Sequence, residues 1–162
     1  IECNTYVSDE VYDYSLNHFS HPLCRYHQDW IRALLWDNYT TQQTIDLYLA
    51  LKTNGVPAVI EKFDGYKHID IAIPRHKFNI EIDGMHHHYD SNQALNDLKR
   101  TYHSFRKGYF TIRVPNVLVE RRLNDAVEYI HVELQIFRRH IDQKPSMQQH
   151  PFQLNQMIFD FH

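Results

Sequence analysis

The sequence predicts an α/β domain in which a mixed sheet is flanked by helices. Residues 67–88 contain two short runs in which isoleucine or phenylalanine alternates with other residues, separated by a Pro-Arg-His-Lys turn at 74–77. This period-2 pattern is typical of two paired strands. Segments with the apolar period of a helix precede and follow the pair. We therefore expect the element order α-β-β-β-α-β-α, with helices packed on a sheet.

Two helices and a strand are expected before that strand pair. A short helix over residues 29–36 lies in an aromatic, acidic segment. The next helix, residues 40–53, opens with a Thr-x-x-Gln capping pattern and ends at an Asn-Gly dipeptide. Residues 56–63 are predicted to form a strand, which an Asp-Gly turn connects to the pair.

Two helices and one more strand are expected after the pair. Ser91 begins a helix that is predicted to end at Gly108. Residues 109–114 then alternate as a strand does, and residues 117–140 have the pattern of a long helix. We expect the first of these helices to pack on the core through an apolar stripe made of Leu95, Leu98, Tyr102 and Phe105.

Length and composition indicate one globular domain with two extensions. The chain has 162 residues, 43% of them hydrophobic, and few glycines or prolines, which argues against disorder. We expect an N-terminal extension (1–37), a core domain (38–140) and a C-terminal tail (141–162). Without a visible signal peptide or membrane-length apolar run, we expect an intracellular protein, cytoplasmic or nucleoid-associated, with no membrane partner. A homodimer or larger complex through the termini stays open.

Acidic residues alternate with the isoleucines of the strand pair. Period-2 geometry puts Glu81 and Asp83 on one face of their strand, and Asp70 has the same phase on the partner strand. Three carboxylates crowded in this way repel one another unless a cation lies between them. The pattern predicts a divalent metal site on this face. An isolated Glu-x-Asp on a strand would instead indicate solvent-facing polarity.

The charge of the chain is unevenly distributed. The net charge is -3, yet residues 1–46 hold seven acids against two bases, whereas residues 99–122 hold seven bases against one acid. A local positive face is what phosphate binding requires, although such a run by itself favours a solvated helix surface. Arg100 either pairs with Asp97 one turn away or holds a phosphate. The bases expected to contact nucleic acid are Lys99, Arg100, Arg106, Lys107 and Arg113.

A series of short motifs along the chain resembles a known nuclease superfamily. They are Ile69-Asp70, Glu81-Ile-Asp83-Gly84, His87, Asp97-Leu-Lys-Arg100, Gly108-Tyr109 and Ile112-Arg113-Val-Pro-Asn116. In this order they resemble the PD-(D/E)xK, restriction-endonuclease-like superfamily, and within it the small branch around the very-short-patch-repair endonucleases and the DUF559-type proteins. The resemblance covers residues 40–120. It implies a restriction-endonuclease-like α-β-β-β-α-β core.

The resemblance also implies an activity and a cofactor. A metal-dependent endonuclease would hydrolyse phosphodiester bonds, with DNA the expected nucleic-acid partner, by means of Mg2+ or Mn2+. These ions prefer oxygen ligands. Here they would be held by Asp70, Glu81, the backbone carbonyl of Ile82 and Asp83. His87 would join the three acidic residues as a catalytic group, acting as general acid or base or contacting the phosphate.

The chain departs from the family pattern at two positions. The third motif position is often Lys in the wider superfamily, but it is Asp83 here, which fits the small branch alone. The helix before the first strand often supplies a Glu ligand, and the nearest candidates in this chain are Gln43, Thr44 and Asp46. The missing Glu and the acidic N-terminus keep open a rival function, that of a catalytically inactive nuclease-fold module that binds nucleic acid or a protein partner.

Two further groups of residues have the types that bind zinc. The three histidines at 86–88 are consecutive, so they cannot easily share one tetrahedral ion, and we favour one functional histidine among them. The Cys24-x-x-His27 pattern together with Cys3 fits a zinc site only weakly. For these cysteines we favour packing as small residues.

Overall fold

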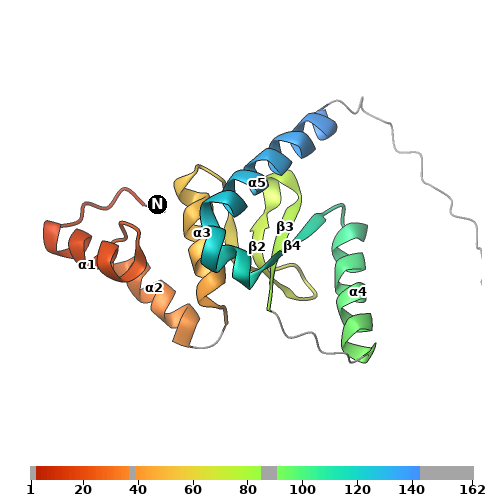
Figure 1. Cartoon of the computed structure of the whole chain (residues 1–162), viewed down its shortest axis with the longest axis horizontal. Coiled ribbons are helices and arrows are strands. Elements are labelled where there is room, and N and C mark those ends of the chain that lie inside the picture. Colours follow the sequence, from red (N-terminus) through yellow and green to blue (C-terminus); the bar gives the residue numbers. More distant parts are fainter. Residues whose placement is uncertain (1–2, 37–38, 85–90, 143–162) are drawn as a thin grey trace, which may run out of the picture.

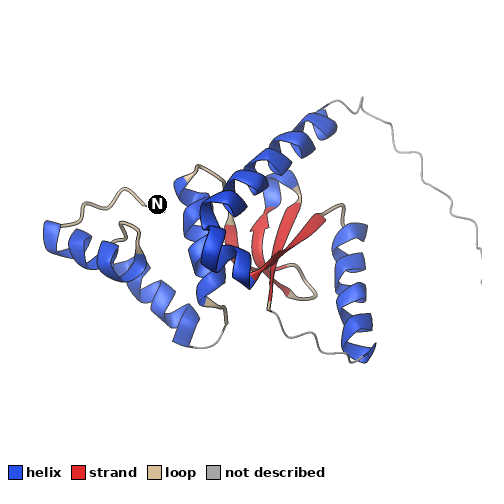
Figure 2. Cartoon of the chain, viewed as in Figure 1, coloured by secondary structure: helices blue, strands red, loops and turns tan. Residues whose placement is uncertain are grey.

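The computed structural model describes residues 3–36, 39–84 and 91–142. It shows a four-stranded mixed sheet flanked by helices, so the predicted α/β class is confirmed (Figure 2). From α3 onward the elements follow the predicted order (Figure 1). In chain order the elements are α1 (Asp9–Phe19), α2 (Arg25–Trp36), α3 (Gln42–Thr53), β1 (Val59–Phe63), β2 (His68–Ile73), the 3-10 turn η1 (Pro74–His76), β3 (Phe78–Asp83), α4 (Ser91–Arg106), β4 (Phe110–Pro115) and α5 (Asn116–Asp142).

The strands of the sheet lie in their sequence order, β1-β2-β3-β4. β2 is antiparallel to both of its neighbours, whereas β3 and β4 are parallel. A parallel pair needs a crossover connection, and α4 lies in that connection. Between β2 and β3 the chain reverses through η1 and Lys77, which adopts a left-handed φ of 50°. This is the turn predicted at residues 74–77.

The hydrophobic core lies between one face of the sheet and the helices α3 and α5. The alternating apolar residues of β2 and β3 point into this core, and Ile71 and Phe78 are fully buried. α3 is buried along most of its length, as its broad apolar set predicts. It begins one residue later than the capping pattern indicated, because Thr41 rather than Thr40 accepts the N-cap hydrogen bond, from the Thr44 N–H at 3.2 Å.

The expected N-terminal extension consists of two helices that share the core of the sheet. α1 was not predicted, and α2 begins before the expected residue 29. Both Leu23 and Ile31 are buried within the same hydrophobic cluster as the strands. The turn between the helices is held by Ser15, whose hydroxyl donates to the His21 carbonyl at 2.6 Å and accepts from the Leu23 N–H at 2.9 Å. In Figure 1 the two helices lie to one side of α3, away from the sheet.

α4 has the opposite orientation to the one we expected from its apolar stripe. Leu98 and Phe105 are 65% and 72% exposed, and Leu95 and Tyr102 are also exposed. The helix covers the polar face of the sheet, so its polar side turns inward. Among the α4 residues whose side chains are described, only Ser104 is buried. The prediction that this stripe packs on the core is therefore wrong.

α5 is the longest helix and is kinked near its start. Arg122 has non-helical backbone angles of φ -143° and ψ 45°, which mark the kink. The helix packs on α3 and on the sheet. Within the described ranges, neither α5 nor any other helix combines the length and the apolar character needed to cross a membrane.

The fully buried Phe78 provides a direct test of this core. We expect Phe78→Ala to lower the free energy of unfolding by about 3–5 kcal/mol, because it leaves a cavity beneath α3 and α5. Phe63→Ala is the matched control and should cost about 0.5 kcal/mol or less, since Phe63 is 59% exposed. Urea unfolding monitored by circular dichroism measures both. Equal losses for the two variants would contradict this assignment of the core.

Candidate active site

The register of the sheet aligns four charged residues in a row across the strands. The antiparallel pairing of β1 and β2, continued through its unpaired position, places Glu61 opposite Asp70. Continued by one residue, the pairing of β2 and β3 places Glu81 on the other side of Asp70. In the parallel pair, Glu81 is the partner of Arg113. Three carboxylates and one guanidinium therefore occupy adjacent positions on four strands.

Part of this row lines a polar hollow of about 230 Å³ between the sheet and α4. The three predicted carboxylates lie in it together, as does Ile82, whose carbonyl was the fourth predicted ligand. Two of the five predicted phosphate-binding bases also line it. We call this set of residues the hollow: it consists of Lys67, Asp70, Glu81, Ile82, Asp83, Asp97, Arg100, Thr101 and Arg113.

Asp70 is the most perturbed group of the hollow. Burial raises the pKa of its carboxyl to about 6, and the neighbouring carboxylates of Glu81 and Glu61 act in the same direction. The Ile82 N–H opposes them, because it donates a hydrogen bond to Asp70 Oδ2 at 2.6 Å. Burial, with a contribution from Glu81, also raises the pKa of Glu61. A cation bound beside these carboxyls would stabilise their charged forms.

Lys67 lines the hollow, although it was not among the predicted site residues. Its Nζ lies 2.6 Å from Glu81 Oε1, and its side chain is only 8% exposed. Strand alternation does not predict this, because Lys67 and Asp70 differ in phase. Lys67 instead belongs to a turn in which Asp64 Oδ1 accepts the N–H groups of Tyr66 and Lys67. That turn redirects its side chain toward the polar face.

From the sequence we expected α3 to supply an additional ligand near Asp70. The acidic residue that lies near Asp70 is instead Glu61 of β1. The three α3 candidates are engaged in other contacts. Gln43 donates to Glu120 Oε1 at 2.7 Å, Asp46 accepts from a neighbouring glutamine of its own helix, and Thr44 is buried in the first turn of α3. Glu61 itself has a left-handed φ of 48°, which is rare for a strand residue other than glycine. None of these α3 residues lines the hollow.

The arginines of the hollow each lie near an acidic partner. Arg113 Nη1 is 3.9 Å from Asp83 Oδ2, and Arg100 Nη1 is 3.8 Å from Asp97 Oδ1. Both guanidinium groups are about half exposed, so solvent weakens these pairs. Arg100 thus forms the intrahelical pair with Asp97 and also lines the hollow. The pairing therefore does not exclude the proposed contact with a phosphate.

The remaining predicted site residues lie elsewhere. Lys107 Nζ donates to the backbone carbonyl of Asp64, and Arg106 stacks over the Tyr102 ring at 6.0 Å. Lys99 is exposed on α4 and does not line the hollow. His87 lies outside the described residues.

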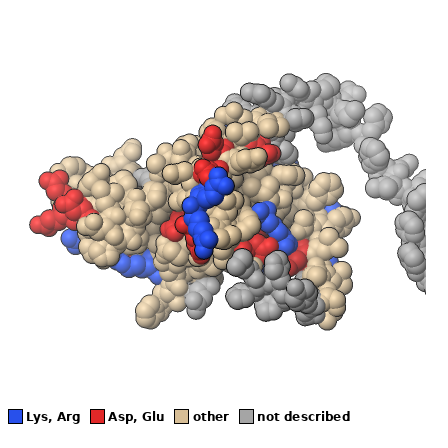
Figure 3. Space-filling view, viewed as in Figure 1, with Lys and Arg blue, Asp and Glu red and all other residues tan. Residues whose placement is uncertain are grey.

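Figure 3 shows basic side chains beside acidic ones over the middle of the molecule. Acidic side chains gather instead at the outer end of α1, whose first turn contains Asp9 and Glu10. Carboxylates at a helix N-terminus are favourable, because they face the positive end of the helix dipole. The acidity of the N-terminal segment thus has a local structural role and lies apart from the hollow.

The donor atoms of the hollow fit a hard divalent cation, but they do not form a closed ligand set. Carboxylate and carbonyl oxygens are the ligands that Mg2+ and Mn2+ prefer. In the part of the chain that the structure describes, no three acidic side chains have ligand oxygens that all lie within 4.8 Å of one another. Glu81 is held by Lys67 and Asp83 faces Arg113. A cation held by all three carboxylates therefore requires Glu81 and Asp83 to turn toward Asp70.

Comparisons of the chain with family models, with curated proteins and with solved structures found no match. The residues of the hollow are therefore the basis for assigning a function.

The raised pKa of Asp70 predicts how the stability of the metal-free protein depends on pH. Because the folded-state pKa of about 6 exceeds the unfolded value of about 3.9, folding favours the protonated form. Relative to Asp70→Asn, the wild type should lose about 2 to 3 kcal/mol of stability as the pH rises from about 4 to about 7.

Urea unfolding of both proteins at pH 4, 5, 6 and 7 in the presence of a chelator measures this difference. The comparison with the isosteric Asn variant cancels the titration of the groups that do not interact with Asp70. A difference in stability that is constant over this pH range would show that the folded protein does not shift the pKa of Asp70.

Proposed function

We propose that this chain is a metal-dependent endonuclease that hydrolyses phosphodiester bonds in DNA. The observation that carries this proposal is the half-buried Asp70 carboxyl, held beside Glu61 and Glu81 with a pKa raised to about 6. Grouping like charges is costly, and it is common at sites that bind a cation or transfer protons. The order α3-β1-β2-β3-α4-β4 around a mixed sheet also agrees with the restriction-endonuclease-like core that the resemblance implies.

The proposed cation ligands are Asp70, Glu81 and the carbonyl of Ile82. A divalent ion bound there would neutralise the scissile phosphate and lower the pKa of an attacking water. Asp83 lies at the rim, where it would add a further ligand or accept a hydrogen bond from the water and orient it. Asp70 keeps its position through the Ile82 N–H, so it would be the fixed ligand of the set.

The basic residues of the hollow have distinct proposed roles. When Glu81 turns toward a cation, the ammonium of Lys67 loses its partner within a largely buried space, where a phosphate oxygen would replace the carboxylate. Lys67 would thus supply the positive charge that the wider superfamily often places at the position of Asp83. Arg100 and Arg113 approach from α4 and β4, and their planar groups suit phosphate oxygens of the nucleic-acid backbone.

The Lys67–Glu81 ion pair favours a second candidate function. An ammonium 2.6 Å from Glu81 already provides a counter-charge within the row of acids. A protein in which this pair is permanent would bind nucleic acid or a protein partner through the same face without cleaving it. Of the two candidate functions, only the first includes cleavage of the nucleic acid.

Cleavage of plasmid and single-stranded DNA in Mg2+ or Mn2+ tests the proposed activity. We expect Asp70→Asn and Glu81→Gln to lower the cleavage rate by about 100-fold or more, because each removes a charged ligand. Asp13→Asn, on α1, should leave the rate unchanged, and a chelator should abolish it. Cleavage that survives in both site variants would contradict the proposed site. Binding without cleavage in the wild type would select the inactive module.

The salt dependence of DNA affinity tests the two arginines of the hollow. We expect Arg100→Gln and Arg113→Gln each to weaken binding and to reduce the slope of log K against log salt by about 1, because each removes one phosphate contact. Arg121→Gln, at the start of α5, is the control and should change neither quantity. Fluorescence anisotropy with a labelled duplex in chelator at several salt concentrations provides the data. Unchanged slopes for both variants would exclude this phosphate contact.

A further inference from the structure

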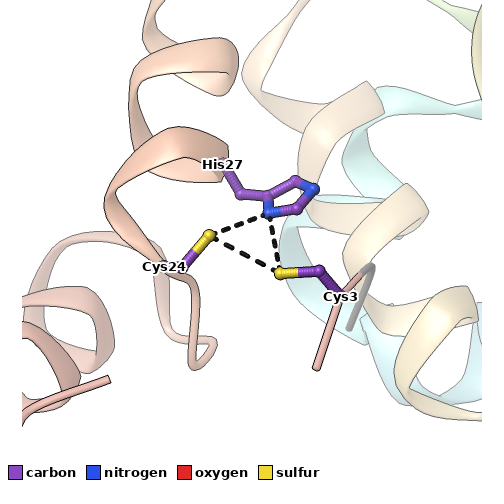
Figure 4. Close-up of side chains that lie close together, drawn as sticks. All are labelled: Cys3, Cys24 and His27. Carbon is purple, nitrogen blue, oxygen red and sulfur yellow. Dashed lines mark hydrogen bonds between the residues drawn. The ribbon is translucent and has the colours of Figure 1, made fainter. Parts of the chain in front are cut away.

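A second cluster of side chains, separate from the hollow, has the composition and geometry of a zinc site. Cys3, Cys24 and His27 point toward one another at the start of α2 (Figure 4). The two Sγ atoms are 3.7 Å apart, and His27 Nδ1 lies 3.6 Å from Cys3 Sγ and 3.1 Å from Cys24 Sγ. Among the residues that the structure describes, this is the only set of three ligand side chains whose atoms all lie within 4.8 Å.

The distances match the edges of a zinc coordination tetrahedron. With Zn–S bonds of about 2.3 Å and Zn–N bonds of about 2.0 Å, tetrahedral angles separate two sulfurs by about 3.8 Å and a sulfur from a nitrogen by about 3.5 Å. The observed 3.7 Å between the sulfurs and 3.6 Å from Cys3 Sγ to His27 Nδ1 agree with these edges to within about 0.1 Å, and the third distance, 3.1 Å, is shorter by about 0.4 Å. Three atoms therefore define one face of a tetrahedron and leave its fourth corner for water or another ligand.

Neither a disulfide nor packing of small side chains accounts for the cluster. Both cysteines are free, and a disulfide would require their sulfurs to be about 2 Å apart. Packing as small residues, which we favoured from the sequence, does not apply to Cys3, because it is exposed. Burial of the Cys3 side chain therefore does not explain why its thiol lies beside Cys24 and His27.

The local fold brings the three ligands together from two distant segments. Cys24 immediately precedes α2, and its carbonyl accepts the Gln28 N–H at 3.0 Å as the helix begins. His27 follows three residues later, so it lies on the same side of the first turn. Cys3 approaches from before α1. The whole of α1 therefore lies in the loop that the cluster would close.

We propose that Cys3, Cys24 and His27 bind one Zn2+ ion that fastens the first residues of the chain to the start of α2. Thiolate and imidazole ligands suit Zn2+ and are poor ligands for the Mg2+ or Mn2+ of the nuclease proposal, so the two sites are independent. α1 and α2 bury few residues, namely Ser15, Gln28 and Ile31. A metal cross-link supplies stability where the buried core is small.

The test uses the full chain, reduced and free of metal, titrated with Zn2+ against a chromophoric chelator and separately with Co2+. We expect about one tightly bound Zn2+ per chain and, with Co2+, a thiolate charge-transfer band with strong visible bands of tetrahedral coordination. The chain has two cysteines in all, so a thiolate band can arise only from them. Histidines elsewhere cannot produce it.

Matched variants locate the site. Cys3→Ser, Cys24→Ser and His27→Asn should each weaken Zn2+ binding by about 100-fold or more, and His18→Asn, a control on α1, should retain it. Cys3 is exposed, so its serine variant keeps the fold, which circular dichroism checks. Zn2+ should raise the melting temperature of the wild type and not that of Cys3→Ser. Absence of a thiolate band, or full affinity in all three ligand variants, would overturn the proposal.

Discussion

Electrostatic repulsion within the row of carboxylates is the constraint on which the polar face of the sheet depends. Like charges directly opposite each other on paired strands are destabilising. The strands cannot slip to escape, because a shift of one residue would move their isoleucines from the core to the polar face. Compensation must therefore be local. The Ile82 N–H supplies it for Asp70, and the ammonium of Lys67 supplies it for Glu81. The buried apolar face thus fixes the positions of the charges on the polar face.

The two faces of the sheet impose different requirements on the helices that cover them. α3 and α5 meet isoleucine, valine and phenylalanine side chains, so their apolar surfaces are buried. α4 meets a charged row, so it presents Asp97, Arg100 and Thr101 to the sheet and leaves its apolar stripe outside. The orientation of α4 is a consequence of the register rather than of its own amphipathic pattern.

Local periodicity carried most of the predictable information. Alternation within single strands correctly placed Asp70, Glu81 and Asp83 on one face, and capping and turn residues located the core elements. Three features depend on relations that lie outside any one segment. Glu61 is a neighbour of Asp70 only through the register of two strands, and Lys67 reaches the hollow only through the Asp-Gly turn. The approach of Cys3 to α2 requires the fold of the whole N-terminal segment.

The contacts of the β1–β2 turn have a mechanical consequence. Lys107, just beyond α4, bonds to the Asp64 carbonyl, and the His103 ring stacks on Tyr66 with centroids 4.7 Å apart. The turn that these contacts hold is the one that aims Lys67 at Glu81. α4 therefore covers the hollow. Through its contacts with the β1–β2 turn, it also helps to hold the Lys67 ammonium beside Glu81. Because α4 both covers the hollow and contacts this turn, a displacement of α4 would open the hollow and move the Lys67 ammonium at the same time.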